Sequence, residues 1–416
     1  MATDLKYDYL LIGAGIMGMT IAYELKKAEP DARIAIIEKE QNVAMHASGR
    51  NSGVLHAGFY YSPDSMKARF TRDGNKLMKE FCRNNGIKVN ECKKVVVAQN
   101  EEELKALFEL ERRGKENGVE LYLVNEEELQ KIEPNAKTYK YALFSPTTAT
   151  VDPREVCQVL KNDLLNKGIR FFFNSGYIER NGNNVITKSH IFNARFVINC
   201  AGLYADKIAR DFGFSDSYTI IPFKGRYLKY SGEVRPVSTN IYPVPNLENP
   251  FLGVHYTITS KGDIKIGPTA MPAFWRENYK GLSNFRLNEF LEIIYFEGKL
   301  FFRNAFNFRK LAWSEIKKNN KKYFAGLALS LVKSVDASKF DQWLPSGIRA
   351  QLLNKESLQL EMDFIVEGDE NSLHLLNAVS PAFTCSFALA KFIVQEKLRL
   401  GNKVDLTTSL SSTGTI

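Results

Sequence analysis

Cysteine is scarce in this 416-residue chain, and the five that occur form no C-x-x-C pair. This spacing excludes the paired cysteines of a zinc finger or a thiol redox motif, and the odd number leaves no complete disulfide framework. We therefore expect reduced, mostly buried thiols of the kind found in cytosolic proteins, and no metal site. The five are Cys82, Cys92, Cys157, Cys200 and Cys385.

Long apolar runs are also missing. The longest one, from Tyr9 to Ala22, contains three glycines and is shorter than the roughly 20 residues that a membrane-spanning helix needs. Regular structure is predicted from Tyr7 onward, which leaves no room for a secretory or organellar presequence. The sequence therefore predicts a cytoplasmic chain with no transmembrane helix.

The composition is that of a globular protein with a large core, because 44% of the residues are hydrophobic and 25% are charged. These values exclude a disordered tail or a collagen, and the length predicts two or three structural units. The net charge of +9 is concentrated in residues 275–333, which hold twelve Lys or Arg, five Asp or Glu and many aromatic residues. We favour a helical subdomain with a basic face; contact with an anionic membrane surface is the alternative, and no nucleic-acid partner is predicted.

The strongest local pattern stands at the start of the chain. A short apolar run, Tyr7–Ile12, leads into Gly13-Ala-Gly15-Ile-Met-Gly18, then a helical period, then a second apolar run that ends at Glu38. This order predicts a βαβ dinucleotide-binding unit: Gly13 allows the tight turn, Gly15 lets a pyrophosphate approach, and Gly18 lets helix and strand pack closely. The following helix N-terminus attracts the phosphates. Glu38 suits a ribose 2′-hydroxyl, which favours FAD or NAD over NADP.

A second strand–glycine–helix unit occurs at 194–204, where an apolar run leads into Cys200-Ala-Gly202. It indicates an α/β fold in which a Rossmann-like domain is built from discontinuous segments. The intervening sequence is rich in strands and predicts an α+β substrate domain with a mainly antiparallel sheet. We assign 1–89, 145–215 and 340–416 to the cofactor-binding domain, and 90–144 and 216–339 to the substrate domain.

One long motif carries a family resemblance: Gly49-Arg-Asn-Ser-Gly-Val-Leu-His-Ala-Gly-Phe-Tyr-Tyr61. Together with the N-terminal unit it resembles FAD-dependent oxidoreductases of the D-amino-acid-oxidase superfamily, and more narrowly the L-2-hydroxyglutarate oxidase/dehydrogenase family. Segments 241–256, 267–270, 347–351 and 377–384 agree in family order. The chain departs from the family pattern at Arg226, Phe383, Thr269, Trp343 and Pro345.

The resemblance implies an FAD-binding domain in which the cofactor is extended. Gly13, Gly15, Gly18 and Glu38 are then expected at its ADP half. Ser48, Arg50, Asn51 and Ser52 are expected in a loop beneath the pyrophosphate and the flavin ring, and Gly202 at the second turn. Ser380 and Pro381 begin a helix whose N-terminus is expected to stabilise negative charge on the reduced ring.

The implied reaction is the oxidation of a small-molecule 2-hydroxy dicarboxylate, with L-2-hydroxyglutarate the first choice. Hydride passes to flavin N5 while a histidine takes the hydroxyl proton; we favour His56 as this base and His255 as its polar partner. Two carboxylates need two cationic contacts. Arg349 is the first, Arg226 or Lys224 the second, and Tyr256 and Thr384 are expected to add hydrogen bonds.

Three questions stay open at this point. The electron acceptor is either a membrane quinone or oxygen, and docking of residues 275–333 on the inner face of a membrane would favour the quinone. The substrate is alternatively an amino acid or glycerol 3-phosphate, oxidised by another FAD enzyme of the same superfamily. A non-catalytic protein stabilised by FAD is the remaining alternative.

Overall fold

The computed structural model describes residues 3–245, 251 and 253–398. An eight-stranded sheet contains the N-terminal βαβ unit, and its central strands β1, β2, β8, β11 and β21 are parallel. Along the sheet the order is β20 (Val366–Gly368), β21 (Ser372–Leu375), β11 (His190–Asn199), β1 (Thr3–Ile12), β2 (Ile34–Ile37) and β8 (Arg170–Phe172). A hairpin of β9 (Tyr177–Asn181) and β10 (Asn184–Thr187) joins β11.

Both faces of this first sheet are covered. Successive residues of β1 alternate between two cores: Leu11 packs under helices on one face, whereas Leu10 and Ile12 pack against the other. The first face is covered by α1 (Ile16–Ala28), α2 (Met66–Asn84), α5 (Pro153–Asn166) and α10 (Ala382–Phe392), and the second by α6 (Ala205–Asp211). Burial on both sides explains why the parallel strands are continuous apolar runs.

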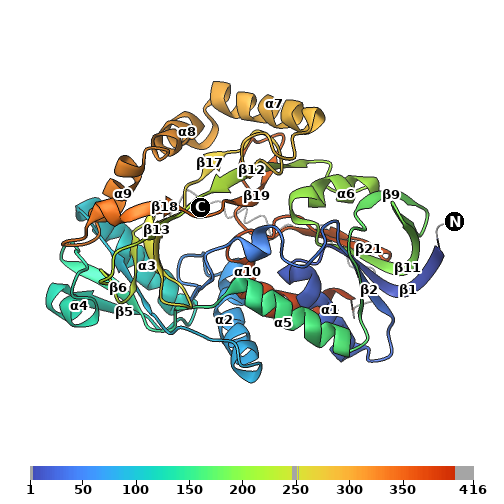
Figure 1. Ribbon diagram of the computed structural model, residues 1–416, viewed down its shortest axis with the longest axis horizontal. Helices are drawn as coiled ribbons and strands as arrows, with labels where there is room; N and C mark the ends of the chain where they lie inside the picture. The colour runs from blue at the N-terminus through green and yellow to red at the C-terminus, as the bar shows by residue number, and fades with distance from the viewer. Residues whose placement is uncertain (1–2, 246–250, 252, 399–416) are drawn as a thin grey trace, which may run out of the picture.

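The second sheet also has eight strands, and all but one of its neighbouring pairs are antiparallel. Its order is β18 (Phe340–Trp343), β13 (Leu228–Tyr230), β16 (Ile264–Gly267), β15 (His255–Ile258), β14 (Asn240–Pro243), β4 (Lys94–Val97), β6 (Tyr141–Ser145) and β5 (Tyr122–Asn125). Helices α3 (Glu101–Glu116) and α4 (Glu126–Ile132) belong to the same region (Figure 1).

A small third sheet lies between the two large ones in Figure 1. It consists of β17 (Met271–Pro272), β12 (Tyr218–Gly225) and β19 (Gly347–Asn354), all antiparallel. A two-stranded pair, β3 (Val54–Leu55) and β7 (Ala149–Thr150), completes the set of sheets in the described residues. β12 and β19 pair over eight positions, so chain segments more than 120 residues apart form one wall.

The basic, aromatic stretch folds into three helices that follow one another along the upper side of Figure 1. They are α7 (Leu287–Arg303), α8 (Phe308–Lys317) and α9 (Lys321–Leu329). This confirms the predicted helical character of the stretch. Within the described ranges, no helix is long and apolar enough to cross a membrane.

The predicted fold class is confirmed: a doubly covered, mainly parallel sheet stands beside a mainly antiparallel one. The strands of the first sheet come from three separate parts of the chain, as the discontinuous prediction requires. The position of one strand differs from the proposed domain division. β18 was assigned to the cofactor-binding segment 340–416, but it pairs with β13 in the second sheet.

Candidate functional site

A cavity of about 990 Å³ lies where the three sheets meet. The carboxyl ends of four parallel strands open into it, at Ile12, Ile37, Cys200 and Leu375. Ligands of doubly wound folds bind at this end of the sheet. The opposite wall comes from β12, β15 and β19, so the cavity connects the dinucleotide-binding turn to the second half of the molecule.

The glycine turn has the geometry that its spacing predicts. Gly13 has a φ of +107°, which side chains rarely adopt, and a Cβ on Gly18 would lie 2.1 Å from the carbonyl oxygen of Gly13. Gly18 therefore permits contact between α1 and the turn, whereas Gly13 and Gly15 line the cavity. The N-terminus of α1 faces the same space, where its partial positive charge attracts an anion.

Glu38 ends β2 at the cavity wall. Its Oε2 accepts a hydrogen bond of 2.8 Å from the backbone N–H of Ala14, and its Oε1 accepts one of 3.0 Å from Glu40 N–H. The carboxylate is thus fixed beside the glycine turn, in the position expected of a ribose acceptor.

The loop after β2 is tied to α1 and to the third sheet. Ser48 Oγ accepts a hydrogen bond of 2.9 Å from Ile16 N–H. Arg50 Nε donates to Met45 O at 2.7 Å, and its guanidinium carbon lies 4.3 Å from the centre of the Tyr279 ring. Asn51 Nδ2 donates to Ser48 O at 2.8 Å. These contacts hold the loop against the cavity, and Ser48, Arg50, Asn51 and Ser52 all line it.

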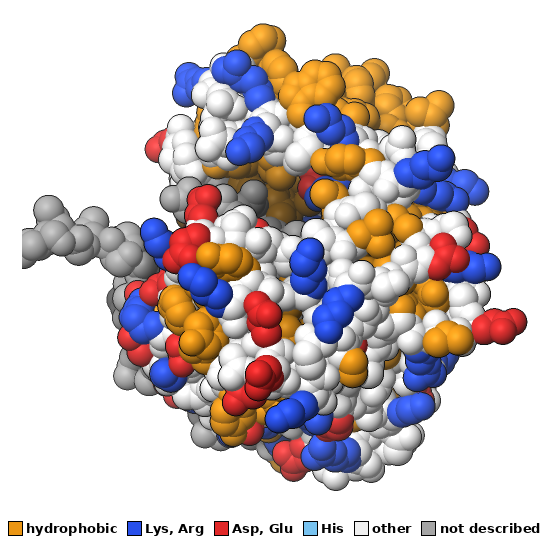
Figure 2. All heavy atoms as spheres, turned by 90° about the vertical axis from the view of Figure 1, so that its left-hand side faces the viewer, with side chains coloured by type: hydrophobic (Ala, Val, Ile, Leu, Met, Phe, Trp, Pro, Cys, Tyr) orange, Lys and Arg blue, Asp and Glu red, His pale blue; other side chains and the backbone are white. Residues whose placement is uncertain are grey.

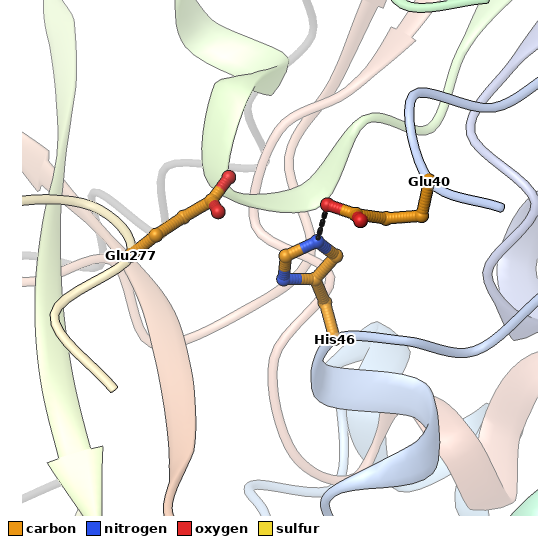
Figure 3. A group of neighbouring side chains, drawn as sticks. All are labelled: Glu40, His46 and Glu277. Carbon is orange, nitrogen blue, oxygen red and sulfur yellow. Dashed lines mark hydrogen bonds and ion pairs between the residues drawn. The ribbon is translucent and has the colours of Figure 1, made fainter. Parts of the chain in front are cut away.

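His46 precedes the same loop and lies between Glu40 and Glu277 (Figure 3). Its Nε2 is 2.9 Å from Glu40 Oε1, and its Nδ1 is 2.7 Å from the Tyr279 hydroxyl. Although the three residues offer ligand atoms within 4.8 Å of one another, the Lys39 ammonium already pairs with both carboxylates. We interpret the group as an ion-pair network that closes this side of the cavity.

The structure brings His56 and His255 into the cavity wall, and both are buried. His255 Nδ1 lies 2.8 Å from Gly253 O, so this nitrogen carries the proton and Nε2 keeps a free lone pair. The ring stacks on Tyr242 with 3.7 Å between centroids. Burial is the main cause that lowers the pKa of His255 to about 3 and that of His56 well below its usual range, and each imidazole is therefore neutral at pH 7.

His56 is held differently. Its backbone N–H donates to the Thr384 hydroxyl at 3.2 Å, whereas its side-chain Nδ1 is buried with no hydrogen-bond partner among the described residues. Lys94 lies close enough that its charge also lowers the pKa of both histidines. Lys94 is itself completely buried with its Nζ unpaired among the described residues, 4.2 Å from the centre of the Tyr242 ring.

Two further cations line the cavity. Arg349, on β19, donates from Nε to Gln351 Oε1 at 3.0 Å and lies 5.3 Å from the centre of the Phe251 ring. Lys67, in the first turn of α2, is almost completely buried. Burial and the neighbouring Arg349 lower the pKa of Lys67 to about 7.

The N-terminus of α10 completes the wall. Ser380, Pro381 and Thr384 all line the cavity, as does Gly202 at the second glycine turn. A Cβ on Gly74 of α2 would lie 2.3 Å from Thr384 O. This close helix contact fixes the start of α10 relative to α2.

Three residues predicted to bind substrate lie outside the cavity lining. Lys224 donates to Asn278 Oδ1 at 2.9 Å, and Arg226 stacks on Trp343 at 3.8 Å. The side chains of a strand alternate between its faces, and in this part of the chain Phe223, Gly225 and Tyr227 line the cavity instead. For the same reason His255 lines the cavity while Tyr256 lies in the core of the second sheet.

Sequence reasoning missed Lys67 as a cavity residue. The signal was its place on the buried stripe of α2, which continues through Thr71, Asn75 and Met78 at helical spacing. A lysine that begins such a stripe is unusual, because lysine is rarely buried without a partner.

Comparison with known proteins decides the family. A profile described as FAD dependent oxidoreductase matches residues 8–396. The chain belongs to this family. It is an enzyme, and FAD is its cofactor. The glycine turn fits this cofactor, since Gly13 and Gly15 line the cavity without side chains and Gly18 lets α1 pack directly on the turn.

The resemblance to L-2-hydroxyglutarate dehydrogenases is confirmed by curated relatives. The Escherichia coli K12 protein of that name is 34% identical over 397 residues, covering 94% of this chain and 93% of the relative. The mitochondrial protein from Bos taurus is 35% identical over 425 residues, covering 95% and 89%.

Among solved structures, L-alpha-glycerophosphate oxidase from Mycoplasma pneumoniae has a TM-score of 0.72 at 21% identity, covering 96% of this chain and 95% of that one. Glycine oxidase from Geobacillus kaustophilus has a TM-score of 0.69 at 18% identity, covering 99% and 100%. At these identities the likeness shows the fold alone.

Proposed function

We propose that this FAD-dependent oxidoreductase oxidises a 2-hydroxy dicarboxylate, with L-2-hydroxyglutarate the substrate and 2-oxoglutarate the product. The observation that carries the proposal is the continuous cavity, which joins the dinucleotide-binding turn to a pocket with two neutral histidines and half-buried Arg349. The names of the relatives, at about one-third identity over almost the whole chain, support this substrate.

The residues around the turn are assigned to the cofactor. Gly13, Gly15, Gly18 and Glu38 hold the ADP half, and the loop Ser48–Ser52 supports the remainder. Gly202 contacts it from the second turn, and the N-terminus of α10 at Ser380 and Pro381 adds positive potential. When bound, FAD supplies the two-electron acceptor for the hydride.

The geometry favours His255 over His56 as the proton acceptor, which reverses the preference from the sequence. The bond from His255 Nδ1 to Gly253 O fixes the tautomer and leaves Nε2 able to accept the substrate hydroxyl proton. His56, whose Nδ1 has no partner among the described residues, then serves as the polar neighbour. Arg349 binds a substrate carboxylate, because a guanidinium grips this group bidentately.

Anaerobic reduction of the bound flavin tests the substrate. The absorbance of the yellow protein is followed after addition of L-2-hydroxyglutarate, with D-2-hydroxyglutarate, L-malate, glycerol 3-phosphate and an amino acid in parallel. Bleaching by the L-hydroxyglutarate alone is expected. Bleaching by glycerol 3-phosphate or the amino acid instead would establish the alternative substrate class.

The same reaction tests the base. His255→Gln is expected to slow flavin reduction by about 10²- to 10⁴-fold, the usual contribution of general base catalysis. His56→Gln is expected to have a smaller effect at equal flavin content. The opposite order would assign the proton transfer to His56.

A surface on α7 and α8 supports docking on an anionic membrane. Its exposed apolar side chains include Leu287, Leu291, Tyr295, Phe302 and Trp313, and we call these five the α7–α8 surface. Phe302 is 82% exposed. In Figure 2 apolar side chains gather at the top of the molecule, with basic side chains beside them. Exposed aromatic residues beside cations are typical of interfacial binding.

The charges around this surface have one sign. The acidic residues of the two helices, Glu289, Glu292, Glu297 and Glu315, are buried or half-buried, whereas Arg303, Arg309, Lys310 and Lys317 are exposed. Each basic residue near an anionic bilayer contributes about 1 kcal/mol. We therefore propose peripheral binding to the inner face of a membrane, with a quinone, rather than oxygen, as the electron acceptor.

Vesicle sedimentation tests the docking. We expect binding to phosphatidylserine-containing vesicles that weakens at high salt, and no binding to phosphatidylcholine alone. The double substitution Phe302→Ser and Trp313→Ser should abolish it. Ile178→Ser removes an equally exposed side chain from β9, far from the α7–α8 surface in sequence, and should leave it unchanged. Failure of wild type to bind anionic vesicles would contradict the proposal.

A further inference from the structure

Lys67 is a buried cation with no hydrogen-bond or ion-pair partner among the described residues. Its side chain is 3% exposed and reaches the cavity wall. Among the described residues its Nζ makes no hydrogen bond or ion pair, and it lies 5.7 Å from the centroid of the Phe364 ring. A buried ammonium without a paired counter-charge is costly, and an anion that enters the cavity would offset that cost.

The neighbouring carboxylate, Asp363, attracts the Lys67 ammonium but does not pair with it directly. It accepts hydrogen bonds from the backbone N–H groups of Met66, Lys67 and Phe364, at 2.7, 3.0 and 2.8 Å. Its charge is therefore directed at the N-terminus of α2, and no ion pair with the Lys67 ammonium occurs among the described residues.

The carboxylates that line the rest of the cavity are also occupied. Each has its own partner elsewhere in the wall: Glu38 at Ala14, Asp211 at Tyr177, Glu277 at Lys39 and Glu289 at Arg276. Lys67 and Arg349 thus form a two-cation end of the cavity, close enough for Arg349 to lower the pKa of Lys67.

We propose that Lys67 binds the substrate carboxylate remote from the reacting carbon, while Arg349 binds the carboxylate beside it. This assignment rests on the proposed function. The planar fork of arginine matches a carboxylate in one fixed orientation, which suits the reacting end. A lysine ammonium is a point charge on a flexible stem and suits the distal carboxylate. Lys67 therefore takes the place that the sequence assigned to Arg226 or Lys224, and it makes the pocket selective for dianions.

Calorimetric titration of the FAD-loaded protein tests the assignment. Glutarate and pentanoate have the same chain length but carry two carboxylates and one, respectively, and neither can be oxidised as a 2-hydroxy acid. Wild type is expected to bind glutarate about 10- to 100-fold more tightly than pentanoate, which is the effect of one hydrogen bond to a charged group. Lys67→Met should remove this preference and leave pentanoate affinity unchanged.

Three further variants guard against indirect effects. Lys67→Arg keeps the positive charge and should keep a preference for glutarate. Lys76→Met removes the same charge from an exposed position of α2 and should behave as wild type. Lys67→Gln serves as a second neutral variant should Lys67→Met lose its flavin. The assignment is wrong if a neutral, FAD-loaded variant keeps the preference, or if its affinity for both acids falls equally.

The proposed function and this inference fail separately. Glutarate binding does not depend on turnover, so a Lys67-dependent preference together with no flavin reduction by L-2-hydroxyglutarate would retain the dianion site and reject the substrate. Flavin reduction by L-2-hydroxyglutarate, together with glutarate binding that does not depend on Lys67, would retain the proposed substrate and reject Lys67 as the site of the distal carboxylate.

Discussion

Replacing Lys94 with methionine should stabilise the protein at neutral pH. Lys94 is completely buried on β4, and burial lowers its pKa from 10.5 to about 7. One pKa unit corresponds to about 1.4 kcal/mol, so the charged form costs the fold about 5 kcal/mol. Three aromatic rings lie 4.2, 5.1 and 5.5 Å from Nζ and return about 2 kcal/mol of this as cation–π attraction. A gain of about 3 to 5 kcal/mol is expected, since methionine has a similar volume.

The gain should depend on pH in a defined direction. The folded chain releases the Lys94 proton near pH 7 and the unfolded chain near pH 10.5, so unfolding takes up a proton between these values. The wild-type penalty is therefore complete below pH 7 and disappears as the pH rises through this window. The advantage of Lys94→Met should shrink accordingly.

Urea unfolding of both FAD-loaded proteins, at about pH 6 and about pH 9.5, measures this difference. Groups that titrate in both proteins cancel in the comparison, and Lys76→Met controls for loss of a surface charge. A variant no more stable than wild type at the lower pH would refute the reasoning, as would an equal gain at both values. Burial and, to a smaller extent, Lys94 lower the pKa of His255, the proposed base, so the substitution should also shift the acidic limb of the pH–rate profile upward.

Two other substitutions test the framework around the site. Gly18→Ala places a Cβ 2.1 Å from Gly13 O and should abolish FAD retention, measured as flavin absorbance per protein. The control Gly326→Ala, which has open space around the new Cβ, should retain full flavin. A yellow Gly18→Ala protein would contradict the packing argument. Arg276→Met breaks a fully buried bidentate pair with Asp206, at 2.6 and 2.8 Å, and should lower the free energy of unfolding by about 3 to 5 kcal/mol. A loss below about 1 kcal/mol, the range of surface pairs, would show that this pair does not hold α6 against the segment that follows β17.

The cofactor half of the site was predictable because it is local in sequence. Gly13, Gly15, Gly18 and Glu38 belong to one βαβ unit, and their spacing alone decides the tight turn and the helix N-terminus. The loop from Ser48 to Ser52 was predictable from its motif, although its contacts reach Tyr279, Ser346 and Lys265 as well as α1.

The substrate half depended on pairings between distant segments. Arg349 lines the cavity whereas Arg226 and Lys224 do not, although all three are cations on or beside paired strands. Which face each one takes follows from the register of β12 against β19, and a shift of one residue would exchange the faces.

The amino-acid sequence by itself determined the fold class, the dinucleotide-binding unit and the family, because these rest on short-range spacing and on motif order. Only the tertiary structure placed Lys67 beside Arg349, left Lys94 buried next to two histidines, and moved Tyr256 into the core. The physical reason is that burial and charge proximity arise from contacts between elements far apart in the chain. The burial and the charged neighbours of a lysine are therefore set by the tertiary structure.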